Sequence, residues 1–131
     1  MKHYALDTST LACFVRGEGL VPRRLVAQAP QEVAIPAIVA YEIRCGLSRY
    51  ERPHLMTAFE NLLRSVAVLG FDAEAAEHAA DILTQQDEAG PRLGPHDVLI
   101  AATARRHGCT LVTRKTAEFA RVPGLLLEDW Y

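Results

Sequence analysis

The sequence predicts an α/β fold, with helices on both faces of a mainly parallel central sheet (an α/β/α sandwich). Short apolar runs typical of strands alternate with longer amphipathic segments typical of helices along the whole chain. Such alternation is typical of parallel strands joined by crossover helices. With 131 residues, of which 50% are hydrophobic, the chain has the size and apolar content of one domain. We therefore expect a single domain over residues 1–131.

The first half of the chain predicts three strands separated by helices. A strand-like run ends at Asp7, and the hydroxyl residues 8–10 that follow it are good N-caps for a helix. Pro36 closes the second strand, and a helix is expected to begin directly after it. In chain order, we expect a strand at 3–6, helices at 8–15 and 22–29, a strand at 32–36, helices at 37–47 and 54–64, and a strand at 66–69.

The second half predicts two more strands and the longest helix. That helix carries an alanine-rich face suited to close packing against a neighbour. A loop rich in glycine and proline at 90–95 follows it, and Gly108 ends the next helix. In chain order, we expect helices at 72–88 and 96–107, a strand at 109–113, a short turn or helix at 116–119, and a last strand near 125–127.

Charge and cysteine content limit the classes of function. A formal net charge of −2 with 23% charged residues argues against a basic arm or tight nonspecific coating of nucleic acid. An RNA enzyme stays open, because a carboxylate metal site is itself acidic. The cysteines Cys13, Cys45 and Cys109 are far apart and form no CxxC pair, and no stretch has the pattern of a signal peptide or membrane span. We therefore expect a reduced, cytoplasmic protein without membrane association.

Three acidic residues lie at the edges of apolar segments. Asp7 ends the strand expected at the centre of the sheet, where a side chain points into the crevice above it. Glu42 borders the buried stripe of its helix, and Asp97 opens a helix whose next residues are apolar. Each acid also has a structural explanation. Asp7 suits an N-cap, Asp97 suits a first helical turn, and Glu42 suits a partly solvated flank paired with Arg44 or Arg49.

Together, the three acids predict a divalent metal site. All three fall at segment ends that feed the same edge of one small sheet, and burying like charges together is costly unless a cation compensates. Carboxylate oxygens suit Mg²⁺ or Mn²⁺, which keep positions for phosphate oxygens. The expected chemistry is phosphodiester hydrolysis, in which the metal activates water and offsets the charge of the phosphate.

A rim near the last strands adds further candidates. Glu118 is a fourth acid, although an exposed turn position explains it equally well. Arg114 and Lys115 are candidates for contacts to nucleic-acid phosphate, although two basic residues in a loop are more often plain surface. The hydroxyl residues Thr8 and Thr113 are further candidates for such contacts.

In-line attack by water is the mechanism that we expect from these acids. Asp7 and Asp97 would bind the main ion, Glu42 would bind it or orient water, and Glu118 would complete the shell or a second site. Attack by water leaves a 5′-phosphate and a 3′-hydroxyl, whereas attack by the internal 2′-hydroxyl leaves a cyclic phosphate. The number of ions stays open at this point.

A set of motifs with specific order and spacing runs through the chain. They are LDTS at 6–9, IP at 35–36, YEI at 41–43, Gly46, GPHDVLIAATA at 94–104, LVTR at 111–114, EF at 118–119, VPGL at 122–125 and EDW at 128–130. With these motifs, the chain resembles the PIN-domain ribonuclease toxins of the VapC type, from bacterial type II toxin-antitoxin pairs. The resemblance covers nearly the whole chain and implies a PIN-like sandwich.

The resemblance also carries expectations for the site and for partners. It places Asp7, Glu42 and Asp97 on the metal-binding acids of the family, and Glu118 where many members carry a fourth. Lys115 departs from the pattern, because similar toxins often have asparagine or another small polar group there. The resemblance further implies cleavage of structured RNA such as tRNA or rRNA, homodimerisation, and inhibition by a VapB-like antitoxin whose C-terminal segment occupies the active groove.

Other interpretations explain the sequence less well. Glu74, His78 and Asp81 share one helix face and could form a second metal site, although a solvated face explains them better. His96 adjoins Asp97 and could contact substrate, although we favour a helix-cap or surface role for it. An aspartyl-phosphate enzyme needs another acid very close to Asp7, which the segment DTST does not provide. A PIN fold that only holds RNA or a protein would bind without cleaving, and the three acids count against it.

Overall fold

The computed structural model describes residues 2–86, 90 and 92–131. Across these residues, five strands pair into one sheet in the order β3-β2-β1-β4-β5, and every pairing is parallel. The strands are β1 Tyr4–Leu6, β2 Val33–Pro36, β3 Ala67–Leu69, β4 Thr110–Val112 and β5 Leu127–Glu128. The predicted parallel sheet is therefore confirmed, with β1 at its centre.

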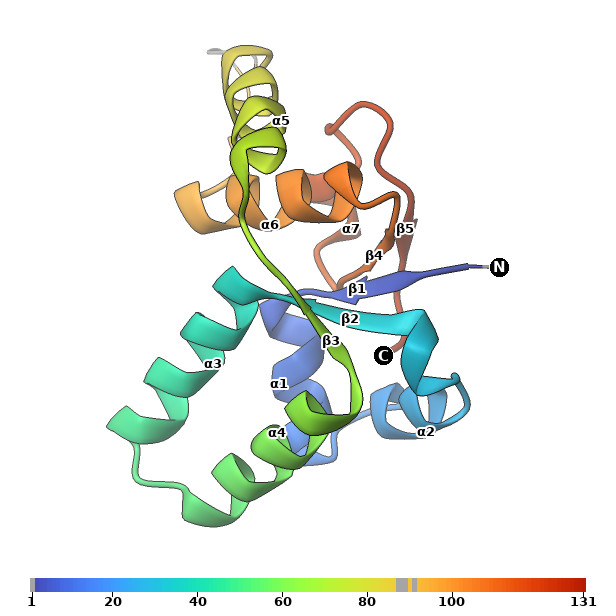
Figure 1. The fold of residues 1–131 in the computed structure, drawn as a ribbon, viewed down its shortest axis with the longest axis vertical. Helices are drawn as coiled ribbons and strands as arrows, with labels where there is room; N and C mark the ends of the chain where they lie inside the picture. Colours follow the sequence, from blue (N-terminus) through green and yellow to red (C-terminus); the bar gives the residue numbers. More distant parts are fainter. Residues whose placement is uncertain (1, 87–89, 91) are drawn as a thin grey trace.

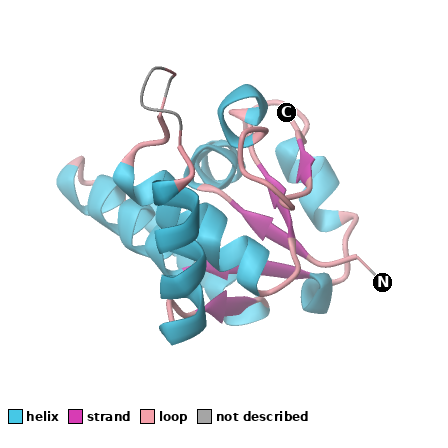
Figure 2. Ribbon diagram, turned by 90° about the horizontal axis from the view of Figure 1, so that it is seen from above, coloured by secondary structure: helices cyan, strands magenta, loops and turns pink. Residues whose placement is uncertain are grey.

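Helices cover both faces of the sheet, as the alternation of elements predicts. They are α1 Thr8–Arg16, α2 Val21–Val26, the 3-10 helix η1 Pro30–Glu32, α3 Ala37–Arg49, α4 Pro53–Ser65, α5 Ala73–Thr84, α6 Pro95–Arg106 and α7 Thr116–Phe119. In Figure 1, α1, α2 and α4 lie below the sheet, whereas α5 and α6 lie above it. Figure 2, turned by 90°, shows the strands side by side with helices around them. Among the described helices, none is both long and apolar enough to cross a membrane.

The winding direction of the chain reverses at the centre of the sheet. From β1 the chain moves to β2 and β3 on one side, and it then returns past β1 to β4 and β5 on the other. Because parallel crossovers are right-handed, this reversal puts the two sets of helices on opposite faces. Ligands of such sheets bind at the carboxyl ends of the strands beside the reversal. Here that place is the junction of β1 and β4.

The central strands are buried on both faces, which explains why their sequences are continuous apolar runs. Ala5 and Leu6 of β1 and Leu111 and Val112 of β4 are 0% exposed. The edge strand β3 is more open, and Val68 is exposed. The strands whose carboxyl ends meet at the reversal are therefore among the most deeply buried parts of the sheet.

The second helix is shorter than the predicted span 22–29. It ends at Val26, and the chain then enters η1. Ala29 precedes Pro30 and has an extended conformation, with φ −67° and ψ 138°. This correction follows from a local rule, because the ring of a proline disfavours helical geometry in the residue before it.

The helix predicted at 72–88 is also shorter, and it is not the longest. α5 ends at Thr84 and has 12 residues, whereas α3 and α4 have 13 each. Just beyond its end, the side-chain carbonyl of Gln86 accepts the N–H of Leu93 at 2.6 Å, which ties the chain to the loop that follows. Positions 87 and 88 of the predicted helix lie outside the described residues.

The last strand lies later than the predicted span 125–127. β5 pairs with β4 in a register that places Glu128 beside Val112, and the Glu128 carbonyl accepts the Thr113 N–H at 2.9 Å. A run of three leucines carries no signal for this register. The hydrogen bonds of the neighbouring strand set it instead.

Candidate active site

Asp7 lies at the carboxyl end of β1, where it is 2% exposed. Its side chain is the N-cap of α1 and accepts the Thr10 backbone N–H at 2.8 Å. The Ser9 hydroxyl contacts both carboxylate oxygens, at 2.9 and 3.1 Å. The capping explanation for Asp7 is therefore confirmed. It is compatible with a role in a site, because the same bonds fix the orientation of a buried carboxylate.

Thr113 supports Asp7 from the neighbouring strand. β1 and β4 pair with Leu6 beside Val112, and the Asp7 N–H donates to the Val112 carbonyl at 3.0 Å. One residue further, the Thr113 hydroxyl donates to Asp7 Oδ2 at 2.5 Å and accepts the Lys115 N–H at 2.9 Å. Thr113 is 0% exposed. The structure thus places this residue beneath Asp7 and away from solvent.

Asp97, in the first turn of α6, faces a lysine. The Lys115 Nζ donates to Asp97 Oδ2 at 3.1 Å, with the two side chains 47% and 21% exposed. Burial lowers the pKa of Lys115, but the hydrogen bond and charge of Asp97, together with the charges of Asp7 and Glu118, raise it above its ordinary value. One ammonium group therefore stands in the field of three carboxylates.

Glu42, on α3, links α1 and α6. Its Oε1 accepts the Thr8 hydroxyl at 2.7 Å, and its Oε2 lies 3.2 Å from Nδ1 of His96. Arg44, one of two arginines considered as its partner, pairs with Glu60 at 3.1 Å instead. Thr8 directly follows Asp7 in the chain, and His96 directly precedes Asp97. Through its contacts with these two residues, Glu42 therefore lies at the same edge of the sheet as the two aspartates.

The remaining rim residues point in different directions. Glu118 is exposed in the single turn of α7 and acts on the site through its charge on Lys115. The Arg114 guanidinium lies 3.6 Å from the centre of the Tyr131 ring. Arg114 is thus directed to Tyr131, whereas Lys115 turns to Asp97.

Two polar residues at the site, Ser9 and His96, were not assigned to it from the sequence. The Ser9 contact has a local signal, because a hydroxyl two residues after an aspartate can bond back to its side chain. The His96 contact with Glu42 has no local signal, since it joins residues 54 positions apart. His96 therefore contacts an acid of the site, beyond the cap or surface role expected for it.

The donor set fits a hard divalent cation. The four acids offer carboxylate oxygens, the ligands that Mg²⁺ and Mn²⁺ prefer. The Lys115 ammonium is bonded to one of these acids, Asp97. As they stand, no three His, Cys, Asp or Glu side chains of the described residues are grouped to hold a metal ion. Asp97 is bonded to Lys115 and Glu42 to its own partners, so an ion would require these carboxylates to exchange partners.

A groove adjoins one of these acids, Glu42, and has a volume of about 470 Å³. Thr8 and Glu42 form part of its wall. The rest of the lining comes from α1, α3, the chain that leads into α4 and the first turn of α4, through Ala12, Val15, Arg16, Ile43, Gly46, Leu47, Tyr50, Arg52 and Leu55. The groove therefore joins a mostly apolar channel, with two arginines, to an acidic residue of the site.

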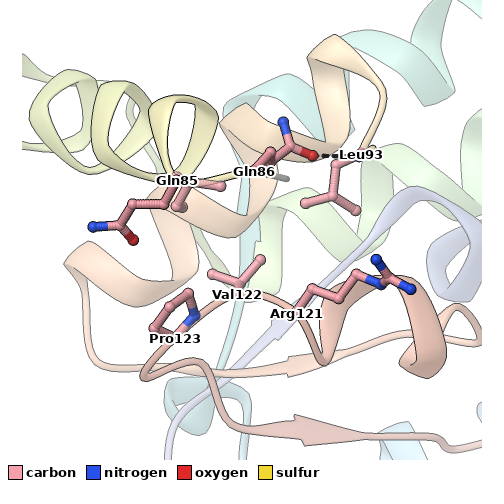
Figure 3. Close-up of a pocket in the computed structure, with 7 residues that line it drawn as sticks. Gln85, Gln86, Leu93, Arg121, Val122 and Pro123 are labelled. Carbon is pink, nitrogen blue, oxygen red and sulfur yellow. Dashed lines mark hydrogen bonds between the residues drawn. The ribbon is translucent and has the colours of Figure 1, made fainter. Parts of the chain in front are cut away.

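A second pocket, of about 330 Å³, has a different lining (Figure 3). It is lined by Ile82, Gln85, Gln86, Leu93, Arg121, Val122 and Pro123. Figure 3 shows the Gln86 amide bonded to Leu93 above Val122 and Arg121. None of the four acids is among these described lining residues, so we do not assign this pocket to the site.

The face of α5 that was considered for a second metal site makes other contacts. His78 Nδ1 accepts Nε of Arg105 at 2.9 Å, and Glu74 lies 3.0 Å from Arg106. Asp81 is exposed. Two of the three potential ligands are thus engaged with arginines of α6, which explains this face as part of the packing between the two helices.

Comparison with known protein families and sequences gives a consistent picture. The family model described as the PIN domain matches residues 4–125. The tRNA(fMet)-specific endonuclease VapC of Shigella flexneri is 30% identical over 131 residues, covering 99% of each chain. Ribonuclease VapC2 of Rickettsia felis is 30% identical over 99 residues, covering 75% of this chain and 74% of that protein.

Solved structures agree with the sequence comparisons. The crystal structure of DNA-bound VapBC from Salmonella typhimurium contains a chain with a TM-score of 0.89 and 27% identity, with 100% of both chains covered. VapBC2 from Rickettsia felis, bound to a DNA fragment from its promoter, gives a TM-score of 0.87 at 27% identity, with 98% of both chains covered.

Proposed function

Because this chain belongs to the PIN-domain family and, within it, to the VapC ribonuclease toxins of VapBC toxin-antitoxin systems, we propose that it is a Mg²⁺-dependent endoribonuclease, with Mn²⁺ as a substitute ion. PIN-domain nucleases are typically metal-dependent. The observation that carries the choice of ion is the set of carboxylates at the carboxyl edge of the sheet, where Asp97 holds the Lys115 ammonium at 3.1 Å and the charges of Asp7 and Glu118 act on the same group.

The proposed roles follow from how each acid is held. Asp7 and Asp97 would bind the ion directly, Glu42 would bind it or orient the attacking water, and Glu118 would complete the shell. When bound, a divalent ion supplies a Lewis acid that activates water and offsets the charge of the phosphate. Thr113 would position Asp7, because its buried hydroxyl donates to that carboxylate. A ligand that is fixed in advance loses little freedom when it binds.

Structured RNA, such as tRNA or rRNA, is the proposed substrate. The relatives from Shigella flexneri and Salmonella typhimurium are named tRNA(fMet)-specific endonucleases. On this chain, the Thr8 hydroxyl and the Lys115 ammonium are proposed to contact phosphate near the acids. An ammonium carries three donors, so Lys115 can bond Asp97 and a phosphate oxygen together. Arg114 would contact RNA further along the rim.

A VapB-like antitoxin is the proposed protein partner, and its C-terminal segment would lie in the groove of about 470 Å³ beside Thr8 and Glu42. The apolar lining suits apolar side chains of such a segment, and its occupation would cover Glu42. Solved relatives from Salmonella typhimurium and Rickettsia felis are VapBC complexes. We also propose that the toxin forms a homodimer, on the basis of the family resemblance, and that residues 1–131 form one domain, on the basis of length and apolar content.

Cleavage of total cellular RNA by purified, antitoxin-free protein tests the proposed activity. The reactions contain Mg²⁺, Mn²⁺ or EDTA, with wild type and Asp7→Asn side by side. Asparagine has nearly the same size and can still cap α1, so loss of activity would reflect loss of charge. Discrete fragments that disappear with EDTA and with Asp7→Asn support the proposal. Binding of RNA without cleavage under every condition would favour a PIN domain that only binds.

A further inference from the structure

Lys115 places a positive charge beside the acids of the site, where its ammonium is bonded to Asp97. We propose that the Lys115 ammonium takes the position of one divalent cation, so that this chain binds one ion fewer than its acids would bind without the lysine. The inference deepens the proposed function and rests on it in one respect, because it treats the acids as metal ligands.

The first argument is the position of the ammonium. Nζ of Lys115 donates to Asp97 Oδ2 at 3.1 Å, so it occupies an oxygen that an ion would need. Asp7 and Glu118 also act on this charge. The ammonium therefore contacts one of the four acids directly, and the charges of two others act on it.

The second argument is that both ends of the lysine are fixed. Its backbone N–H donates to the Thr113 hydroxyl at 2.9 Å, and that hydroxyl in turn donates to Asp7. Its ammonium is bonded to Asp97. Lys115 is also the residue directly before α7, which carries Glu118. The charge is thus tied to the same backbone that supports the acids and stays with them when ions are absent.

The third argument is electrostatic. Like charges gathered at a partly buried site repel one another, and a cation among them relieves that repulsion. A monovalent ammonium relieves part of it and repels a divalent ion that approaches closely. With an uncharged side chain at position 115, Asp97 Oδ2 and the volume of the ammonium would be available to a hydrated ion. Mg²⁺ and Mn²⁺ keep several waters when they bind, so they need this volume.

Arg114 provides a matched control for this argument. It is adjacent to Lys115 in the chain and carries the same charge, but its guanidinium lies on the Tyr131 ring. Removal of the arginine changes the net charge by the same amount without opening the contact to Asp97. A comparison of the two variants therefore distinguishes loss of the ammonium bonded to Asp97 from a general change in the electrostatic potential of the protein.

Counting bound Mn²⁺ tests the proposal. Antitoxin-free full-length protein is stripped with EDTA, dialysed to equilibrium against a series of Mn²⁺ concentrations, and analysed by electron paramagnetic resonance for free ion. Wild type, Lys115→Met and Arg114→Met are compared, and circular dichroism confirms that all three are folded. Methionine keeps the length of the side chain and removes its charge. Half of the Lys115 side chain is exposed, so we expect Lys115→Met to fold.

The expected result is one additional Mn²⁺ per chain in Lys115→Met, with no change in Arg114→Met. An equal number of ions in wild type and Lys115→Met would overturn the proposal, even if affinity changed. A gain of one ion in Arg114→Met would also overturn it. Cleavage of RNA is measured on the same samples: active wild type with equal counts contradicts only this inference, whereas metal-independent cleavage contradicts the proposed function.

Discussion

The Thr113 hydroxyl donates to Asp7 Oδ2 at 2.5 Å across the junction of the two central strands. The bond joins residues 106 positions apart, and both side chains are buried. The same hydroxyl accepts the backbone N–H of Lys115. One threonine thus orients an acid of the proposed site and anchors the lysine that faces the other acids.

Replacement of Thr113 by valine should reduce both activity and stability. Valine keeps the shape but removes the donor to Asp7 and the acceptor for Lys115. Partners of metal ligands typically contribute about 10-fold to 100-fold to affinity or activity, and a lost bond to a charged group costs about 1.5–3 kcal/mol. RNA cleavage rates and urea unfolding provide the measurements. Thr113→Ser, which keeps the hydroxyl, is the control. Full activity in Thr113→Val would show that Asp7 does not need this support.

His96 should contribute to activity through Glu42. Its Nδ1 lies 3.2 Å from Glu42 Oε2, so His96→Ala removes a partner that holds the carboxylate. We expect the cleavage rate to fall roughly 10-fold with little change in stability, because the side chain is exposed. His54→Ala, on the exposed start of α4, is the matched control. Equal rates in the two variants would rule out a role for the contact.

The chemical ends of the RNA products report on the attacking group. Attack by water oriented by Glu42 leaves a 5′-phosphate and a 3′-hydroxyl. Mass spectrometry of fragments from a short RNA identifies the ends, and ligation that requires a 5′-phosphate confirms them. A 2′,3′-cyclic phosphate would mean that the 2′-hydroxyl attacks, and the proposed role of Glu42 would then be lost.

The stability of the fold at acidic pH should depend in part on the charge of Glu128. Its pKa is held below the ordinary 4.5, first by the Trp130 indole N–H at 3.0 Å, against an opposing effect of burial, and then by Lys2. A carboxyl with a lowered folded-state pKa stabilises the protein above its unfolded pKa, and this contribution disappears as the pH falls through the folded value.

Urea unfolding between pH 7 and pH 3 tests this dependence. Wild type should be more stable than Glu128→Gln at neutral pH, by a small amount because the pair with Lys2 is largely solvated. The difference should vanish only below pH 4.5. A difference that persists unchanged to pH 3 would mean that the charge of Glu128 does not contribute.

The sequence predicts the three main acids of the proposed site because their signals are local. Asp7 closes a strand, Asp97 opens a helix and Glu42 borders a buried stripe, and each pattern can be recognised within a few residues. The parallel sheet is predicted for a similar reason, since the alternation of strands and helices repeats along the chain. The N-cap role of Asp7 also follows from the hydroxyl residues beside it.

Contacts between distant segments could not be predicted in this way. The bonds of Asp7 to Thr113, of Asp97 to Lys115 and of Glu42 to His96 join residues 106, 18 and 54 positions apart. They depend on the strand order, which periodicity does not determine. The register of β5 has the same origin, because hydrogen bonds to β4 set it.

The central claim is that divalent ions bound by Asp7, Glu42 and Asp97 allow this chain to cleave RNA. The most direct measurement is a Mn²⁺ titration of EDTA-stripped protein, in which bound ion and the rate of RNA cleavage are followed in the same samples for wild type and Asp97→Asn. We predict that the rate rises in proportion to occupancy in wild type, and that both binding and cleavage are lost in the variant. Cleavage that proceeds at full rate without bound ion, or in Asp97→Asn, would contradict the claim.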